Sequence, residues 1–459
     1  MGLLSVLKGL VVLLPVLIST MAAMMLVGVS YNFIAQKSCS PEGVPEDING
    51  FICGDGAILD EVNDITTTTA SIRSACSAVA SSSFGFLRDV TGKSRPLMFV
   101  GVIGELITVS TFFMAAVYWS SSAWIPPLVQ TFVSGAFGET IMQLGATCLL
   151  IQESTPEELP SRLQVYMTAN LFLMLVGGTI STMILTTFGY RWLFTVAIGL
   201  QVIALLLVII LVKEKENVTK NVQDSLANLK KVFRWRENVI VLWLMLFAGP
   251  ITLSILTSEG ANNSSFYQIQ FRFSMYETSA YTSYSFVIAI VGSMVVPVIL
   301  RKVFHCKDLT IGIIASIMNC LGPVALAFVE TRLWLYLISI LNFMRLVSLP
   351  LPNTVISRIV NHDEIGTYLG IAAVVTLWVP YSITKIYRAV FAATEYTWIG
   401  AYFFVSTGFF VLLVVIYSIS YFLFDESKQT GEITESKENL DQNIENGKSN
   451  LPDRTGIRS

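Results

Sequence analysis

The sequence contains little charge and almost no histidine. Only 13% of its 459 residues are charged, whereas a soluble domain usually has about 25%. The two histidines, His305 and His362, lie in short polar connections without a ligand-spaced neighbour, so we expect no metal site and no cofactor. The net charge of −3 and the lack of a basic stripe argue against a nucleic-acid partner.

Long apolar runs account for most of the chain, which is 53% hydrophobic. A membrane-spanning helix needs about 20 mostly apolar residues, and lipid offers backbone polar groups no partner outside the helix itself. The runs therefore predict an all-α membrane protein with twelve transmembrane helices. They cover residues 9–35, 65–87, 97–118, 127–150, 163–186, 190–212, 239–268, 278–300, 309–329, 332–357, 365–388 and 398–424.

The distribution of lysine and arginine predicts the orientation. Loops 88–96, 213–238 and 301–307 are basic, whereas the loop from Gln36 to Asp64 is acidic, so both termini are expected in the cytoplasm. The chain is then divided into a six-helix half (1–212), a cytoplasmic linker (213–238), a second six-helix half (239–424) and a polar, disordered cytoplasmic tail (425–459).

The six cysteines are scattered and form no framework. Cys39 and Cys53 share one predicted outer loop; they can form a disulfide or remain free thiols, because spacing alone does not define the geometry. No HExxH motif, nucleophile elbow or Asp/His cluster is present, and we therefore do not expect an enzyme.

The stretch FGFLRDVTGKSRPL (84–97) places several charges between two apolar runs. A glycine in the second helix permits close helix packing, a second glycine permits a sharp turn, and proline suits the first turn of a helix. The pattern resembles the signature of the major facilitator superfamily between its second and third helices. The resemblance implies a transporter fold of two six-helix halves and a gating latch made of Gly85, Arg88, Asp89, Gly92, Lys93 and Arg95.

Further stretches resemble the proton-coupled folate transporter family of solute carriers. These are IQESTPEELPSRL (151–163), FGYRWLF (188–194), VISRIVNHDEIGTYLGIAAVV (355–375) and YRAVFAATEYTWIGAYFF (387–404). The first adds Glu153 and Arg162 to the expected gating residues. The chain departs from that family at Met167, where the family has a glutamate, and at Asn353, where it has an arginine.

Ionisable residues at membrane depth usually line a cavity or form pairs. Glu139 and Arg345 are expected to face each other near the midplane, Glu139 as a proton- or cation-sensitive acid and Arg345 as an anion-binding or counter-charge residue. A permanent salt bridge between them is the alternative. Asn353, Trp378 and Tyr381 complete the predicted binding site, although Trp378 and Tyr381 also suit packing roles.

These features together predict a secondary transporter of a small organic solute. By resemblance the solute is folate-like or another organic anion, and protons are candidate co-substrates. The alternative is a non-transporting membrane receptor or scaffold that keeps the fold. The plasma membrane and the endolysosomal membrane are both compatible with the sequence.

Overall fold

The computed structural model describes residues 3–41, 43, 56–155, 158–212, 238–273, 275–360, 364–394 and 397–424, and these residues form helices and their connections. The first half of the chain contains α1 (Leu3–Cys39), α2 (Gly56–Thr91), α3 (Arg95–Val117), α4 (Ile125–Val129), α5 (Gly135–Phe137), α6 (Glu139–Glu153) and α7 (Leu159–Leu211). The second half contains α9 (Val239–Phe271), α10 (Met275–Lys302), α11 (Asp308–Ala327), α12 (Arg332–Ile338), α13 (Leu351–Ile359), α14 (Ile365–Thr394) and α15 (Tyr402–Leu423). Residues 213–237 of the expected linker and the expected tail 425–459 lie outside the described residues.

These elements make the twelve passes that the apolar runs predict. Eight described helices are long and apolar enough to span a membrane by themselves. One of them, α7, comprises two passes because the chain bends at Gly189, whose φ of 80° suits glycine and no other residue type well. The remaining three passes are α2, which is rich in Ser and Thr, and two helices that are broken within the membrane.

The fourth and tenth passes are the broken ones. In the fourth, α4 leads into a π-helical segment (Gln130–Ser134) and α5, and Gly138 then leaves the helical region before α6 begins. In the tenth, α12 continues into a 3-10 segment (Ser339–Met344), and α13 begins after Pro350. Glycine and proline weaken the helical ladder at these points. Each break leaves a helix end at membrane depth, where backbone groups need other partners.

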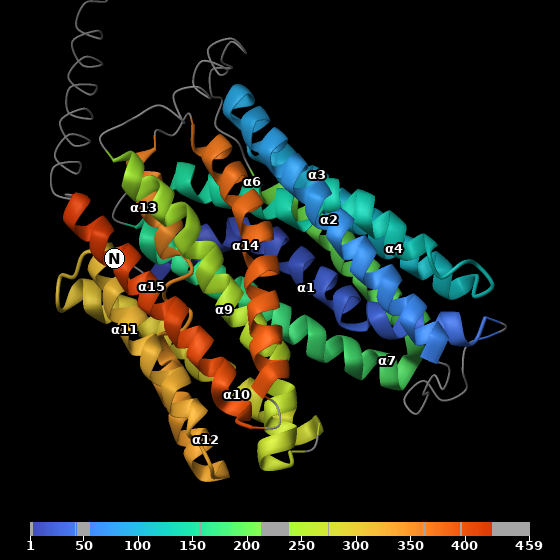
Figure 1. Ribbon diagram of the computed structural model, residues 1–459. Helices are drawn as coiled ribbons and strands as arrows, with labels where there is room; N and C mark the ends of the chain where they lie inside the picture. The colour runs from blue at the N-terminus through green and yellow to red at the C-terminus, as the bar shows by residue number, and fades with distance from the viewer. Residues whose placement is uncertain are drawn as a thin grey trace, which may run out of the picture.

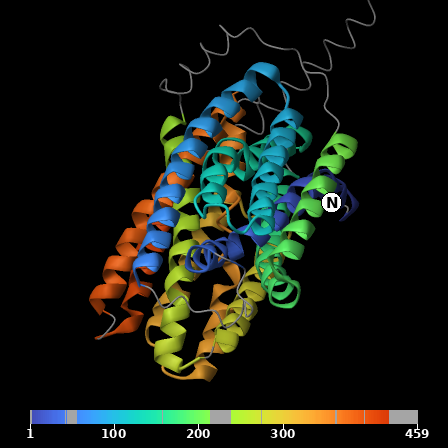
Figure 2. The same cartoon turned by 90° about the vertical axis from the view of Figure 1, so that its right-hand side faces the viewer.

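The two halves meet most closely along α2 and α14 (Figure 1). These two helices are adjacent near the turn between α2 and α3 and diverge toward their opposite ends. We call the membrane side of this turn the turn side. Two further contacts between the halves also lie toward it: Gln164 Nε2 donates to the Leu346 carbonyl at 3.5 Å, and the hydroxyls of Thr168 and Ser293 lie 3.3 Å apart. Figure 2 shows the same arrangement from the side, with α2 along the face of the bundle. This conformation is closed on the turn side.

Candidate functional site

The turn between α2 and α3 has the local structure that its sequence predicts. Gly92 adopts a φ of 67°, in the left-handed region that glycine tolerates best. Pro96 lies in the first turn of α3, where its missing N–H costs no hydrogen bond. The turn therefore ends α2 sharply and places Asp89 close to the other half.

Asp89 connects the two halves through the beginning of α14. Its Oδ1 accepts a hydrogen bond from the Gly366 N–H at 2.9 Å, and its Oδ2 accepts from the N–H and the hydroxyl of Thr367, each at 2.6 Å. The carboxylate thus occupies a helix N-terminus, which favours negative charge. Arg88 Nη1 lies 3.1 Å from Asp89 Oδ1, and both side chains are buried. We call Arg88, Asp89, Gly366 and Thr367 the latch contact.

Three glycines allow α2 and α14 to approach closely. A Cβ atom on Gly85 would lie 2.3 Å from the Gly366 carbonyl oxygen, and one on Gly370 would lie 2.6 Å from the Ser81 carbonyl oxygen. A Cβ on Gly366 would meet Gly85 and Asp89 within 2.6 Å. No other residue type fits this crossing without movement of the backbone.

The other expected gating residues lie around the same side of the molecule. Arg95 Nη2 donates to the Ile209 carbonyl at 2.8 Å, and Lys93 is exposed. Arg162 forms a 2.8 Å salt bridge with Glu158 and contacts the backbone carbonyl of Glu153 at 3.4 Å. The gating role of these residues stays a prediction.

A cavity of about 390 Å³ lies between the halves, within the usual range for small-molecule sites. Helices α1, α6 and α7 of the first half and α9, α13 and α14 of the second contribute to its wall. Glu139 and Asn353, both predicted binding residues, line it. Its described polar lining consists of Glu139, Thr140, Gln143, Thr147, Asn170, Asn353 and Thr376, and most of the remaining wall is Met, Leu, Ile, Ala and Pro.

Glu139 belongs to a polar cluster at the break in the fourth pass. Its Oε1 accepts a hydrogen bond from Gln143 Nε2 at 2.8 Å. Glu105 of α3, which is buried, accepts from the Glu139 N–H at 2.9 Å and from the Ser134 hydroxyl at 2.6 Å. Arg73 of α2 donates to the same hydroxyl at 3.2 Å. We call Arg73, Glu105, Ser134 and Glu139 the Glu105 cluster.

This cluster compensates for the broken helix. Because α6 begins at Glu139, its first N–H groups have no partner within the helix, and the Glu105 carboxylate accepts from one of them. Arg73, Glu105 and Ser134 come from three separate segments of the chain, so no local sequence pattern connects them. Gly135 and Gly138, which lie between Ser134 and Glu139, are the sequence signal of a break.

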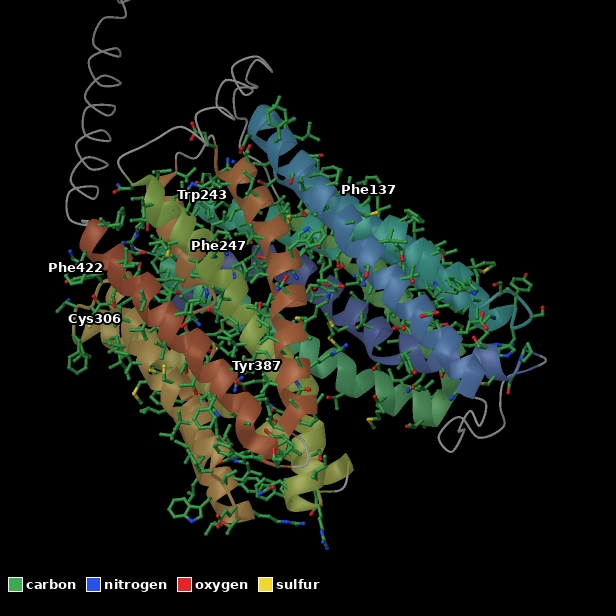
Figure 3. All side chains as sticks on the ribbon, viewed as in Figure 1. Phe137, Trp243, Phe247, Cys306, Tyr387 and Phe422 are labelled. Atoms are coloured by element: carbon green, nitrogen blue, oxygen red, sulfur yellow. The ribbon has the colours of Figure 1, made fainter. Side chains whose placement is uncertain are left out.

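A salt bridge between Glu139 and Arg345, the alternative to a facing arrangement, is wrong. Arg345 forms its ion pair with Glu259 of α9, whose side chain is fully buried. Four buried tyrosines, Tyr267, Tyr281, Tyr387 and Tyr402, lie near this ion pair. Tyr387, which is labelled in Figure 3, comes from α14, and its hydroxyl lies 2.7 Å from that of Ser406. Arg345 is not among the residues that line the cavity.

Two predicted stacking residues lie away from the cavity wall. Trp378 and Tyr381 are more than half exposed, and neither lines the cavity. Lys385 Nζ lies over the Tyr381 ring at 4.4 Å from its centroid. These residues follow the cavity-lining stretch of α14 toward the side opposite the turn side.

Cys39 is disulfide-bonded, while Cys53, its candidate partner, lies outside the described residues. Among the described residues, no group of His, Cys, Asp and Glu is arranged to bind a metal ion.

The family model of the Major Facilitator Superfamily matches residues 55–384, well over half of the sequence. The chain therefore belongs to the major facilitator superfamily, whose members span the membrane and transport small solutes. A search among curated proteins gave no match.

Solved transporter structures share this fold over almost their full length. The proton:xylose symporter XylE bound to 6-bromo-6-deoxy-D-glucose has a TM-score of 0.66 at 12% identity, covering 89% of this chain and 94% of that chain. A bacterial homologue of the iron transporter ferroportin in an outward-facing state has a TM-score of 0.65 at 12% identity, covering 90% and 99%. The human organic anion transporter MFSD10 has a TM-score of 0.62 at 13% identity, covering 89% and 98%. At these identities the likeness establishes the fold alone.

Proposed function

We propose that the protein is a secondary transporter that moves a small organic solute by alternating access. The observation that supports this most directly is a cavity between the two halves with an ionisable side chain, Glu139, in its wall. The halves contact each other on the turn side and diverge on the other. Such an arrangement suits one of the two end states of a transport cycle.

In this proposal residues 1–212 and 239–424 move as two units, and the latch contact breaks and re-forms once per cycle. The basic loops suggest that the turn side faces the cytoplasm, which places both termini there. The conformation is then open toward the outside of the cell or the lumen of an organelle. Both the plasma membrane and an endolysosomal membrane suit the proposal.

Glu139 is the proposed proton-binding group. Its side chain is partly exposed into the cavity, where the remaining described lining is uncharged. The protonation state of Glu139 determines which solute charge the cavity accepts, because an unpaired charge in apolar surroundings is costly. A folate-like or other anionic solute, which the family resemblance suggests, requires a protonated Glu139. A cationic solute requires an ionised one.

Uptake into cells that express the chain tests the proposal. Labelled folates, organic anions and organic amines are supplied at acidic and neutral outside pH, to the unchanged protein and to Glu139→Gln. Saturable uptake that depends on pH in the unchanged protein but not in Glu139→Gln is the expected result.

Saturable uptake that responds equally to pH in both proteins would remove Glu139 from the coupling role and leave the transport proposal intact. The competing function is a non-transporting receptor or scaffold. Absence of saturable uptake for the whole panel, with the protein present in the membrane, would favour that function.

A further inference from the structure

The wall of the cavity has one kind of charge. Among the 24 residues that line it, Glu139 is the sole charged side chain. Amides and hydroxyls from both halves, including Gln143, Asn170 and Asn353, supply neutral hydrogen-bonding groups. An anionic solute therefore meets no cationic partner on this described surface.

The surroundings of Glu139 do not balance its charge. The Glu105 cluster contains two carboxylates, Glu105 and Glu139, and one guanidinium, Arg73, which interacts electrostatically with Glu139. Glu105 accepts from the N–H of Glu139, at the N-terminus of α6, and from the Ser134 hydroxyl, and these contacts hold its carboxyl group beside Glu139. One guanidinium thus serves two carboxyl groups, so the cluster has no cation to spare for an anionic solute.

Arg345, a cation in the interior of the second half, is already paired. Arg345 is bound to Glu259, and this pair is neutral as a unit. Releasing Arg345 for an anionic solute would leave Glu259 buried without a counter-charge, which typically costs several kcal/mol. No cationic side chain is thus among the described residues that line the cavity, and Arg345 is not available to supply one.

We propose, building on the transport function above, that the solute is an organic cation whose protonated amine pairs with Glu139. The ammonium N–H groups would contact the carboxylate and the oxygens of neighbouring amides such as Asn170. The apolar body of the solute would pack against the methionine and leucine side chains of the wall, among them Met167 and Met174.

An amine with N–H donors fits better than a quaternary ammonium ion. Quaternary ammonium groups are typically recognised by aromatic cages, and no aromatic side chain is among the residues lining this cavity. A carboxylate with amide neighbours instead matches the hydrogen-bonding capacity of a primary or secondary ammonium group. Methionine walls adapt to apolar bodies of different shape.

Exchange with protons follows from this assignment. One carboxylate pairs with either an ammonium ion or a proton, so the two ligands compete for Glu139. The titratable and charged groups that interact with Glu139 are Glu105 on α3, Arg73 on α2 and Tyr166 on α7. Amine binding is expected to weaken at low pH, and the transport cycle would couple the exit of an amine to the entry of a proton.

Two matched sets of probes separate solute charge from solute shape. The first set is tryptamine, tryptophol and indole-3-propionate, and the second is amantadine, 1-adamantanol and 1-adamantanecarboxylate. Binding of each compound to the purified full-length protein in lipid nanodiscs is measured by titration calorimetry at pH 7.5 and pH 5.5. The variants are Glu139→Gln and, as a matched acid far from the cavity, Glu277→Gln, whose carboxylate pairs with Arg332 on the surface.

The amine of at least one set is expected to bind at least 10-fold more tightly than its carboxylate at pH 7.5. Glu139→Gln should remove that preference and its pH dependence, while Glu277→Gln should retain both. Thr376→Lys, which introduces a positive charge into the wall from α14, should abolish amine binding and provides a second variant if Glu139→Gln does not fold.

Equal or tighter binding of the carboxylates would overturn the proposal, as would absence of binding by every amine. An amine preference that persists unchanged in Glu139→Gln would also overturn it. None of these results bears on transport itself, which the uptake assay measures separately, so the two proposals fail in distinguishable ways.

Discussion

Replacement of Asp89 by asparagine tests whether the latch contact holds the two halves together. The two carboxylate oxygens of Asp89 accept from different N–H groups, those of Gly366 and Thr367. Asparagine has the same size but a single acceptor oxygen, so its amide nitrogen would face one of these donors. The change also removes the Asp89 carboxylate from Arg88, whose side chain is only 4% exposed.

The expected cost follows from these contacts. Hydrogen bonds to charged groups contribute about 1.5–3 kcal/mol each, and the substitution removes one such bond and weakens those that remain. A total of about 3 kcal/mol is reasonable, which corresponds to roughly a 100-fold change in the ratio of the two conformations. The loss applies only to the conformation closed on the turn side, because these contacts join the two halves there.

Electron paramagnetic resonance distances provide the assay. Spin-labelled amino acids are introduced at Ser120 and Glu330, which are exposed in the loops opposite the turn side, one in each half. Asp89→Asn should shift the distance distribution between them toward shorter values as that side closes. The matched control is Asp308→Asn, because Asp308 is also buried and paired with arginines, but within the second half alone.

An unchanged distribution in Asp89→Asn would refute the reasoning, provided that the variant is folded. So would an equal shift in Asp308→Asn, since that result would attribute the change to a general loss of stability.

Three further predictions concern other contacts. Gly85→Val should disfavour the conformation closed on the turn side more strongly than Asp89→Asn does, because the Cβ of the valine alone would lie 2.3 Å from the Gly366 carbonyl oxygen. The spin-label distance between positions 120 and 330 measures this effect, and an unshifted distribution would contradict the prediction. Glu259→Gln alone should destabilise the protein by about 3–5 kcal/mol because Arg345 remains buried without a counter-charge, and adding Arg345→Met should recover much of the loss. Thermal unfolding in detergent measures the stability of both variants, and an equal or larger loss in the double variant would disprove the coupling. Glu105→Ala should lower the free energy of unfolding by about 1–2 kcal/mol through loss of the cap on α6, whereas an unaltered unfolding temperature would show that the cap contributes nothing.

The sequence alone determined the class of protein and the number of passes. Low charge and apolar runs of about 20 residues depend only on composition and length, and lipid enforces helices on such runs. The turn between α2 and α3 was equally predictable, because Gly92 and Pro96 act on their own backbone. The latch role of Asp89 came from resemblance, and the structure adds its contacts with Gly366 and Thr367.

The tertiary structure decided which side chains meet. The partner of Arg345 depends on how the helices around it are rotated about their axes, because successive helical residues point in directions about 100° apart. The depth at which the cavity ends along α14 likewise decides that Thr376 lines it while Trp378 and Tyr381 are exposed. Gly135 and Gly138 signal the break before Glu139, but only the tertiary structure shows that Glu105 of a neighbouring helix stabilises it. Hydropathy records how deep a residue lies in the membrane, but contacts between helices determine the direction in which it points.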